Sequence, residues 1–598
     1  MSIKRKLFEF RRLLRHQTIV AIILILGFLT FISYLNSTST NLSETHSGNP
    51  VRSPLNRAEG NADQSVLPGD PDPSTFLIDG AKGNFEPDMP ERKDEPGDYG
   101  EAVFIDGGKI EVQKSMAEFG FNTYVSDMIS MNRSIPDVRM PECKYWNYPT
   151  DLPTASVVIA FHNEGWSPLL RTVHSVLLRT PSHLLKEIIM VDDFSAKEHL
   201  KEKLANYLTR FNGKVKLIRN SEREGLIRTR TIGAKAAEGE VVIFLDAHCE
   251  VNYNWLPPLL APIRYNRRVM TVPIIDGIDM NTWEYRRVYG AADKHFRGIF
   301  EWGLLYKETE LSPEEKANRK HESQPFRSPT HAGGLFAIDK KWFEELGYYD
   351  PGLQIWGGEQ YELSFKIWQC GGGILFVPCS HVGHVYRNHM PYGFGKLTGK
   401  PVISTNMLRV IKTWMDGYDK YYYIREPTAV KRTWGDISEQ LALREKLNCK
   451  SFEWFMKNVA YDVPRSYPLL PDNDVWGEAK NLATGKCIDT LGNPVPGRIG
   501  ASSCHGYGGN QMFRLNVEGQ LTQGEWCIRN YGGVMKTNHC VKGTVNGPYK
   551  YNKNTQQIRD TQRNLCLTVS EDMGSTDLLQ EKCDETSVYQ KFVWTEKF

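Results

Sequence analysis

The sequence predicts an α/β domain with a parallel, Rossmann-like sheet, followed by a smaller all-β domain. The first prediction rests on short apolar runs that alternate with amphipathic segments between residues 156 and 245, the order that builds a parallel sheet. The second rests on the segment after Trp476, which has few helical signals and in which a pattern around cysteine recurs about every forty residues. At 598 residues the chain is too long for one core, so two or more domains are expected.

The amino-terminal region predicts a membrane anchor. Residues 18–35 form an uncharged apolar run of eighteen, long enough for a transmembrane helix, and basic residues precede it. That charge bias places residues 1–17 in the cytosol and the rest in a lumen. The alternative is a cleaved signal peptide, but the run exceeds the usual apolar core and Asn36-Ser-Thr offers no clear small-x-small cleavage site.

Composition indicates the partners and the redox compartment of the residues that follow the predicted anchor. A formal net charge of +2 disfavours a general nucleic-acid binder. Eleven cysteines in an oxidising lumen should mostly pair, and their odd number leaves at least one unpaired within the chain. Sequons at Asn36, Asn41 and Asn132 agree with this topology. Residues 36–139 are polar and rich in Pro, Gly, Asp and Ser, which predicts a flexible stem.

Short buried strands are expected at 156–161, 187–191, 215–218 and 240–245. Helices are expected at 168–180, 196–211 and 226–237, the first of which places its apolar residues on one face. No G-x-G-x-x-G follows the first strand. His162-Asn163-Glu164 stands there instead, and Asp192-Asp193 ends the second strand. A carboxylate at a strand end is well placed to accept hydrogen bonds from a nucleoside.

The central strand ends in Asp246-Ala247-His248. Alternation along the chain directs the carboxylate and the imidazole to one side, at the edge where open α/β sheets bind ligands. An oxygen and a nitrogen donor together suit a divalent metal such as Mn²⁺ that also holds phosphate. The alternative is that both residues only end a strand.

Several motifs occur in one order and spacing: FHNEGW, VDDFS, REGLIRTR, FLDAHCE, HAGGLFAI, IWGGEQYELSFKIWQCGG and VGHVYR. From Cys143 to the carboxyl end the chain thereby resembles the polypeptide N-acetylgalactosaminyltransferases, which begin mucin-type O-glycosylation. The resemblance implies a GT-A fold, UDP-GalNAc as donor, Mn²⁺ as cofactor, and Ser/Thr-containing peptides or glycopeptides as acceptors. It also implies a Golgi enzyme with a single-pass type II anchor.

The resemblance assigns site residues by motif. Asp246, His248 and His384 match the metal ligands, although His381 competes with His384 on proximity alone. Asp193 and Arg223 match positions that contact the nucleotide, and Arg387 and Tyr392 match residues of the loop over the diphosphate. Trp356 and Glu359 match positions that line the donor sugar and the reaction centre. Ala160 stands where relatives commonly have Thr, so no side-chain contact is expected there.

These residue types suit glycosyl transfer. A diphosphate leaving group gathers negative charge, which a metal and Arg387 would offset. Glu359 could stabilise positive charge near the anomeric carbon. The family retains anomeric configuration, and same-face attack and a covalent double displacement both remain open. The alternative for Trp356-Gly-Gly-Glu359 is a turn before a helix at 362–369.

After Trp476, three repeats resemble a ricin-type β-trefoil lectin. The family pattern implies disulfides Cys487–Cys504, Cys527–Cys540 and Cys566–Cys583, together with Cys143–Cys379 and Cys370–Cys449, leaving Cys249 free. Asp489, His505 and Asn510 match the sugar-binding positions, which predicts that only the first repeat binds sugar and that this sugar is GalNAc. Arg529 and Thr568 replace the aspartate in the others. The alternative is that Asp489 is a turn residue.

The acceptor segment departs from better-known relatives, which commonly read F-x-W-x-L-x-F-K-W. Here it runs from Phe300 to Glu308, so a carboxylate replaces the closing Trp of the peptide-binding surface. A carboxylate offers hydrogen-bond acceptors to sugar hydroxyls, which predicts a preference for peptides that already carry GalNAc. The alternative is a solvated loop with no role in acceptor binding.

Together these expectations describe a Golgi-anchored transferase with a catalytic domain at 140–460, a linker at 461–473 and a lectin at 474–598. A catalytically inactive, Golgi-anchored GalNAc-binding lectin is the first rival, but every expected catalytic residue is present. A transferase that extends glycans is the second.

Overall fold

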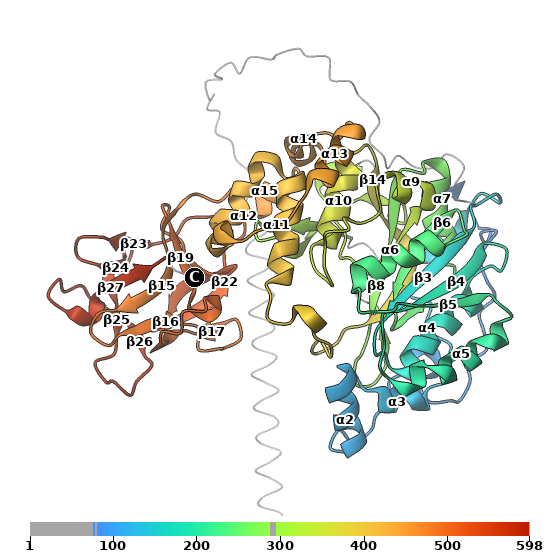
Figure 1. Cartoon of the computed structure of the whole chain (residues 1–598), viewed down its shortest axis with the longest axis horizontal. Helices are drawn as coiled ribbons and strands as arrows, with labels where there is room; N and C mark the ends of the chain where they lie inside the picture. The colour runs from blue at the N-terminus through green and yellow to red at the C-terminus, as the bar shows by residue number, and fades with distance from the viewer. Residues whose placement is uncertain (1–75, 78–79, 288–294, 318, 597–598) are drawn as a thin grey trace, which may run out of the picture. The chain divides into compact units, whose positions relative to one another are not determined.

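The computed structural model describes residues 76–77, 80–287, 295–317 and 319–596 (Figure 1). They belong to one compact unit that spans residues 66–598. The expected cytoplasmic tail, the expected anchor at 18–35 and the sequons at Asn36 and Asn41 lie outside the described residues. Within the described ranges, no helix is long and apolar enough to cross a membrane.

The main sheet confirms the predicted parallel core and adds strands that the sequence did not predict. Its strand order is β12-β14-β8-β13-β6-β3-β4-β5, with β7 beside β14 and β9 beside β8. Strands β6, β3, β4 and β5 are mutually parallel, whereas β13 lies antiparallel between β6 and β8. The strands are β3 (Ala155–Phe161), β4 (Leu185–Asp192), β5 (Val215–Arg219), β6 (Val241–Asp246), β7 (Cys249–Val251), β8 (Val269–Ile278), β9 (Tyr285–Arg286), β12 (Phe326–Arg327), β13 (Phe336–Asp339) and β14 (Gly373–Val385).

Alternate residues of the central strands enter two separate apolar clusters, one on each face of the sheet. Val157 and Ile243 pack with α4, α5 and α7, whereas Val158 and Phe244 pack with α6, α9, α10, α11 and α14 (Figure 1). Burial on both faces explains the unbroken apolar runs. The helices are α4 (Trp166–Arg179), α5 (Glu202–Leu208), α6 (Leu226–Ala236), α7 (Leu256–Tyr265), α8 (Pro313–Ala317), α9 (Lys340–Glu345), α10 (Glu359–Gln369), α11 (Val402–Trp414), α12 (Asp419–Arg425), α13 (Ser438–Lys446), α14 (Phe452–Asn458) and α15 (Val463–Ser466).

Two helix predictions need correction. The segment 196–211 is not one helix, because 3₁₀ turns at Glu198–Leu200 and Thr209–Phe211 flank the short α5. Helix α10 begins at Glu359 and not at residue 362, since Gly358 at its amino end adopts a positive φ of 92°. The glutamate of the Trp-Gly-Gly-Glu motif therefore lies in the first turn of a helix.

The expected flexible stem is wrong for residues 80–139. Helices α2 (Ile110–Phe119) and α3 (Thr123–Met128) fold there, and a short strand β1 (Phe76–Leu77) pairs with β2 (Trp146–Asn147). Phe121 and Ile135 are fully buried in a cluster with Trp283. Arg133 forms a buried ion pair with Glu250, with 2.7 Å between nitrogen and oxygen. The apolar residues of this segment are too scattered for a core of their own, but they complete the core of the following domain.

The carboxyl-terminal domain is all-β, as predicted. Its apolar core contains a residue from each cysteine repeat, namely Ile488, Ile528 and Leu567. The strands form the orders β17-β22-β21-β20-β19-β15-β16-β18, with β27 beside β15, and β23-β24-β25-β26. They are β15 (Asn473–Asn481), β16 (Lys486–Asp489), β17 (Gly497–Arg498), β18 (Gly500–Ser503), β19 (Phe513–Asn516), β20 (Leu521–Gln523), β21 (Trp526–Tyr531), β22 (Val534–His539), β23 (Tyr549–Asn552), β24 (Gln557–Asp560), β25 (Leu565–Val569), β26 (Leu578–Lys582) and β27 (Phe592–Thr595).

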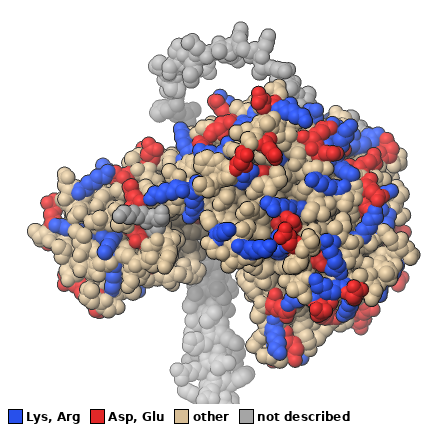
Figure 2. Space-filling view, viewed as in Figure 1, with Lys and Arg blue, Asp and Glu red and all other residues tan. Residues whose placement is uncertain are grey.

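Cysteine pairing and surface charge agree with the sequence. All five disulfides implied by the family pattern are present, and Cys249 is the free, buried cysteine among the described residues. Figure 2 shows basic and acidic side chains interspersed over the face in view. That mixture is what a near-neutral chain would give.

Candidate active site

The candidate site lies where β3 and β6 end side by side. The chain passes from β3 to β4 and β5 on one side and returns to β6 on the other, so strand order reverses between β3 and β6. Such a reversal opens a crevice at the carboxyl ends of the strands. A cavity of about 230 Å³ occupies it. Its walls include the predicted residues Asp193, Arg223, Asp246, His248, Trp356, His384, Arg387 and Tyr392.

Asp246 is the centre of the predicted metal-ligand set. Its Oδ2 lies 3.3 Å from Nε2 of His384, and its Oδ1 accepts a 2.9 Å hydrogen bond from Nη2 of Arg230. Burial alone would raise the pKa of Asp246, but the hydrogen bond from His384 and the charge of Arg230 hold that pKa well below its ordinary value. The carboxylate is therefore ionised and ready to bind a cation.

One ring nitrogen of His248 contacts a carboxylate. Its Nδ1 lies 3.1 Å from Oε2 of the buried Glu164, so Nε2 is the ring nitrogen left to bind a metal. The imidazole rings of His248 and His384 are neighbours, with 4.8 Å between their centroids. Burial opposes ionisation of Glu164, but Arg387 and His248 lower its pKa to about 2. A carboxylate that holds one ring nitrogen fixes the orientation of a histidine ligand.

These donors fit a divalent cation. Asp246 supplies oxygen, and His248 and His384 supply nitrogen, a mixed set that Mn²⁺ accepts. Nδ1 of His384 is buried and has no hydrogen-bond partner among the described residues. Nε2, the ring nitrogen that lies 3.3 Å from Oδ2 of Asp246, is therefore the one that faces the other predicted ligands.

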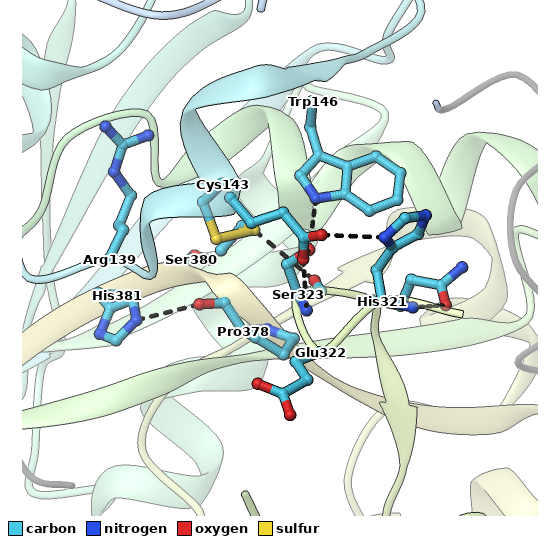
Figure 3. The surroundings of a disulfide bond; sticks show 12 residues. Arg139, Cys143, Trp146, His321, Glu322, Ser323, Pro378, Ser380 and His381 are labelled. Atoms are coloured by element: carbon cyan, nitrogen blue, oxygen red, sulfur yellow. Dashed lines mark hydrogen bonds and ion pairs between the residues drawn. A yellow bond between two sulfur atoms is a disulfide. The ribbon is translucent and has the colours of Figure 1, made fainter. Parts of the chain in front are cut away.

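His381 does not belong to this set. Its Nδ1 lies 3.0 Å from Oδ2 of Asp276, and its Nε2 lies 3.0 Å from the carbonyl oxygen of Pro378. Figure 3 shows this second contact beside the disulfide Cys143–Cys379. Both ring nitrogens are occupied by protein atoms, so the choice of His384 over His381 agrees with the geometry.

The residues predicted to contact the nucleotide lie together in the cavity wall. The carboxylate of Asp193 accepts hydrogen bonds from the backbone N–H groups of Glu224 and Gly225, at 2.8 and 2.9 Å, and contacts Arg223. The Arg223 guanidinium lies 5.7 Å from the ring centroid of Tyr392. Asp193 therefore fixes the loop that carries Arg223, in addition to facing the cavity.

The Trp-Gly-Gly-Glu motif lies beside this loop, because Ile355 pairs with Gly225 through a β-bridge. Trp356 is 38% exposed and lines the cavity, whereas Glu359 is buried and lies outside the cavity lining. Oε2 of Glu359 accepts a 2.7 Å hydrogen bond from the backbone N–H of Gly357. Burial raises the pKa of Glu359, and the charge of Arg230 opposes that rise. Glu359 thus supports the turn that presents Trp356.

Four contacts in this site were not foreseen. Arg230 binds Asp246, Glu164 binds both His248 and Arg387, and Arg387 donates a 2.5 Å hydrogen bond to the carbonyl of Phe119. REGLIRTR and FHNEGW contain the first two residues, but a motif does not reveal which partner each side chain meets. Phe119 lies in the segment expected to be a stem.

The acceptor-side segment forms a hairpin of β10 (Phe296–Phe300) and β11 (Tyr306–Glu310). Phe300, Trp302 and Leu304 are buried, whereas Glu308 is exposed. Loss of water around its hydroxyl raises the pKa of Tyr386 to about 12, and the carboxylate of Glu308 contributes to that rise. Tyr386 packs its ring against His384, with 4.7 Å between centroids. The hairpin thus exposes Glu308 and buries the apolar residues that precede it.

The first lectin repeat brings its three predicted residues together. Oδ1 of Asp489 accepts a 2.6 Å hydrogen bond from Asn510, whose Oδ1 lies 3.0 Å from Nε2 of His505. Tyr507, which sequence reasoning missed, is 89% exposed and stacks on His505 at 5.6 Å. An exposed ring beside a carboxylate and an amide is a suitable surface for a sugar.

Comparisons with known proteins agree with both domains. Residues 156–343 match the family "Glycosyl transferase family 2", residues 316–390 "N-terminal domain of galactosyltransferase", and residues 475–592 "Ricin-type beta-trefoil lectin domain". The chain is 60% identical to "Probable N-acetylgalactosaminyltransferase 7" of Caenorhabditis elegans, over all of this chain and 99% of that protein. It is 47% identical to "N-acetylgalactosaminyltransferase 7" of Homo sapiens, over 87% of this chain and 81% of that protein.

A solved structure is similar over most of the chain. It is described as "Crystal structure of GalNAc-T7 with UDP, GalNAc and Mn2+", and it superimposes with a TM-score of 0.81 at 46% identity. The match covers 89% of this chain and 98% of that chain.

Proposed function

Because the chain belongs to the N-acetylgalactosaminyltransferase family, it transfers GalNAc from UDP-GalNAc with Mn²⁺ as cofactor, and we propose that its acceptors are Ser and Thr hydroxyls of peptides that already carry GalNAc. The observation that carries the site assignment is the convergence of Asp246, His248 and His384 on one cavity at the strand reversal.

Asp246, His248 and His384 would hold the metal. Bound Mn²⁺ neutralises charge that gathers on the diphosphate leaving group. Glu164 orients His248, and Arg387 lies against Glu164 within reach of the same cavity. Asp193 and Arg223 face the nucleotide, and Tyr392 packs beside them.

We assign the sugar and its reaction to the part of the cavity that Trp356 lines. Trp356 would contact the donor sugar, and Glu359 would keep the turn in place through the Gly357 N–H. Since Glu359 is buried outside the cavity lining, the geometry supports retention by same-face attack of the acceptor hydroxyl over a double displacement that uses this carboxylate as nucleophile.

Glu308 supports the glycopeptide preference. An aromatic platform at this position would hold a bare peptide through apolar contact, worth about 1–3 kcal/mol. A carboxylate removes that contact and offers acceptors for sugar hydroxyls. Glu308 is an exposed residue of β11. The first lectin repeat would bind a GalNAc elsewhere on the same acceptor through Asp489, His505 and Asn510.

We place the enzyme in the Golgi as a single-pass type II protein, with residues 18–35 as anchor and both domains in the lumen. Domain boundaries near 140–460 and 474–598 are part of this proposal, with residues 80–139 joined to the catalytic domain.

A transfer assay tests the proposal. Purified protein with Mn²⁺ is offered UDP-GalNAc, UDP-GlcNAc and UDP-galactose, each with matched naked and GalNAc-bearing mucin peptides. We expect transfer from UDP-GalNAc, with a higher kcat/KM on the glycopeptide. Equal values on the two peptides would contradict the acceptor proposal alone, whereas no transfer to either peptide with Mn²⁺ would favour the inactive-lectin alternative.

A further inference from the structure

The second lectin repeat reverses the charge of the first. Cys487-Ile-Asp489 in β16 corresponds to Cys527-Ile-Arg529 in β21, so a guanidinium occupies the position of the carboxylate proposed to bind GalNAc. Asp489 lies opposite Gly500 in the strand register, whereas Arg529 lies opposite Lys536. Directly paired residues of antiparallel strands share one face. Two positive charges therefore meet where the first repeat has one negative charge.

Nothing in the described part of the chain neutralises this pair. Neither Arg529 nor Lys536 has an ion-pair or hydrogen-bond partner for its side chain among these residues. Arg498 of β17 lies opposite Lys536 and adds a third basic residue across these strands, but it forms an ion pair with Asp577. Like charges directly opposite each other destabilise a sheet, so an anion bound here would relieve a repulsion already present in the fold.

A cavity of about 350 Å³ lies at Arg529, within the size range of small-ligand sites. Its lining also contains Tyr531, Asn546 and Tyr549. Tyr531 is 41% exposed and offers a ring face, Asn546 offers an amide, and Tyr549 is buried. Arg563 lines the same cavity, but Asp560 offsets its charge at 3.0 Å. The cavity thus combines groups that suit a sugar with one uncompensated guanidinium.

We propose that this second-repeat cavity binds a sugar that carries a negatively charged group, a carboxylate or a sulfate. A guanidinium donates hydrogen bonds and accepts none, so it favours oxyanions over the neutral hydroxyls that Asp489 would hold. It can also bind a carboxylate or a sulfate through two parallel hydrogen bonds. The protein would then recognise neutral GalNAc in its first repeat and an acidic sugar in its second.

Calorimetric titration of the purified protein with sialyllactose, sulfated lactose and lactose tests this inference. The three probes share the lactose core and differ in the anionic group. We expect both acidic probes to bind at least about tenfold more tightly than lactose, because the hydrogen bonds are charge-assisted. Comparison of the two acidic probes shows whether the cavity prefers the carboxylate or the sulfate. Rising salt should weaken their binding.

Arg529→Gln should remove this advantage, whereas Arg559→Gln should not. Arg559 is an exposed residue of β24 outside the cavity lining, so its loss removes the same charge from the same domain. Asp489→Ala should leave sialyllactose binding unchanged while it abolishes binding to a GalNAc-peptide. Thermal unfolding of each variant verifies the fold. The inference is overturned if lactose binds as tightly as both acidic probes, or if Arg529→Gln and Arg559→Gln have equal effects.

Discussion

Arg230 reaches Asp246 from the helix that precedes its strand, and its Nη2 atom lies 2.9 Å from Oδ1 of that carboxylate. The Arg230 side chain is only 2% exposed, whereas that of Asp246 is 23% exposed and faces the cavity. The arginine fixes one oxygen of Asp246 and leaves the other facing His384. The orientation of a proposed metal ligand thus depends on a residue that does not line the cavity.

Arg230→Lys should weaken metal binding more than it weakens the fold. Lysine keeps the charge but lacks the planar guanidinium that reaches Asp246 Oδ1. Loss of a residue that orients a ligand typically costs about 10–100-fold in metal affinity or activity. We expect the Mn²⁺ concentration for half-maximal transfer to rise within that range. Arg228→Lys on the same helix, where the exposed arginine pairs with Glu224, is the matched control.

His384→Ala and His381→Ala should separate activity from stability. Removing His384 takes away a proposed metal ligand, so kcat/KM should fall by roughly a hundredfold or more, with little change in Tm. Removing His381 leaves the buried carboxylate of Asp276 without one hydrogen-bond partner, which should cost about 1–3 kcal/mol of stability. Transfer assays and urea unfolding of both variants measure the two effects.

The reverse outcome would exchange the roles of these histidines: normal turnover in His384→Ala at saturating Mn²⁺, with loss of turnover in folded His381→Ala.

Glu308→Trp should shift acceptor preference toward naked peptides. The indole would restore apolar contact worth about 1–3 kcal/mol and remove the carboxylate proposed to meet sugar hydroxyls. The ratio of kcat/KM on glycosylated to naked peptide should therefore fall. Glu310→Trp is a matched control, because Glu310 is exposed on the same strand two residues away. If both substitutions change the ratio alike, position 308 has no special role.

Asp489→Asn should abolish retention on a GalNAc-peptide column, while Thr568→Ala at the equivalent position should not.

The Asp489→Asn substitution should also change the pH dependence of stability. Burial opposes ionisation of Asp489, but hydrogen bonds from Ser502 and Gln511 lower its pKa below the ordinary value. A lowered pKa stabilises the fold above the unfolded-state value near 3.8, and that contribution is lost as pH falls through the folded-state value.

Urea unfolding between pH 2 and 7 measures this contribution. The stability difference between the native protein and Asp489→Asn should be constant above about pH 5 and shrink at lower pH. A difference that grows as the pH falls would reverse the assigned direction.

Arg133→Ala should destabilise the catalytic domain by about 3–5 kcal/mol, because it leaves Glu250 buried without its partner. For the same reason, a chain that begins at residue 140 should fold poorly, whereas one that begins at residue 80 should fold and transfer sugar. The midpoint of urea unfolding and the soluble yield test both statements. Arg92→Ala, which removes an exposed ion pair with Glu101, should have little effect.

Much of this architecture could be predicted because its signals lie within short, continuous segments of the sequence. The apolar run 240–245, its flanking polar residues and the cysteine spacing each lie within short segments. Other features depend on contacts between distant residues. Arg387 meets Glu164 across 223 positions, and no short pattern contains both. Strand β13 was missed because an antiparallel strand between two others shows only a short apolar run.

The stem prediction failed for a related reason. Phe121 and Ile135 belong to a longer segment that is rich in Pro, Gly, Asp and Ser, so composition alone predicts disorder. Their burial depends on Trp283, which lies far along the chain. Glu359 was expected at the reaction centre because its motif matches, but the motif could not reveal that its carboxylate is bound to the Gly357 N–H.

The hydrogen bond from Arg387 to the carbonyl of Phe119 makes the segment before the catalytic sheet a part of the reaction chamber. This segment cannot be exchanged as if it were only a spacer. A chimera that joins the first 139 residues of one relative to the catalytic domain of another would carry a piece of one enzyme's chamber into the other. Exchanges intended to alter only distance from the membrane would thereby alter turnover, and a neutral junction has to lie before residue 80.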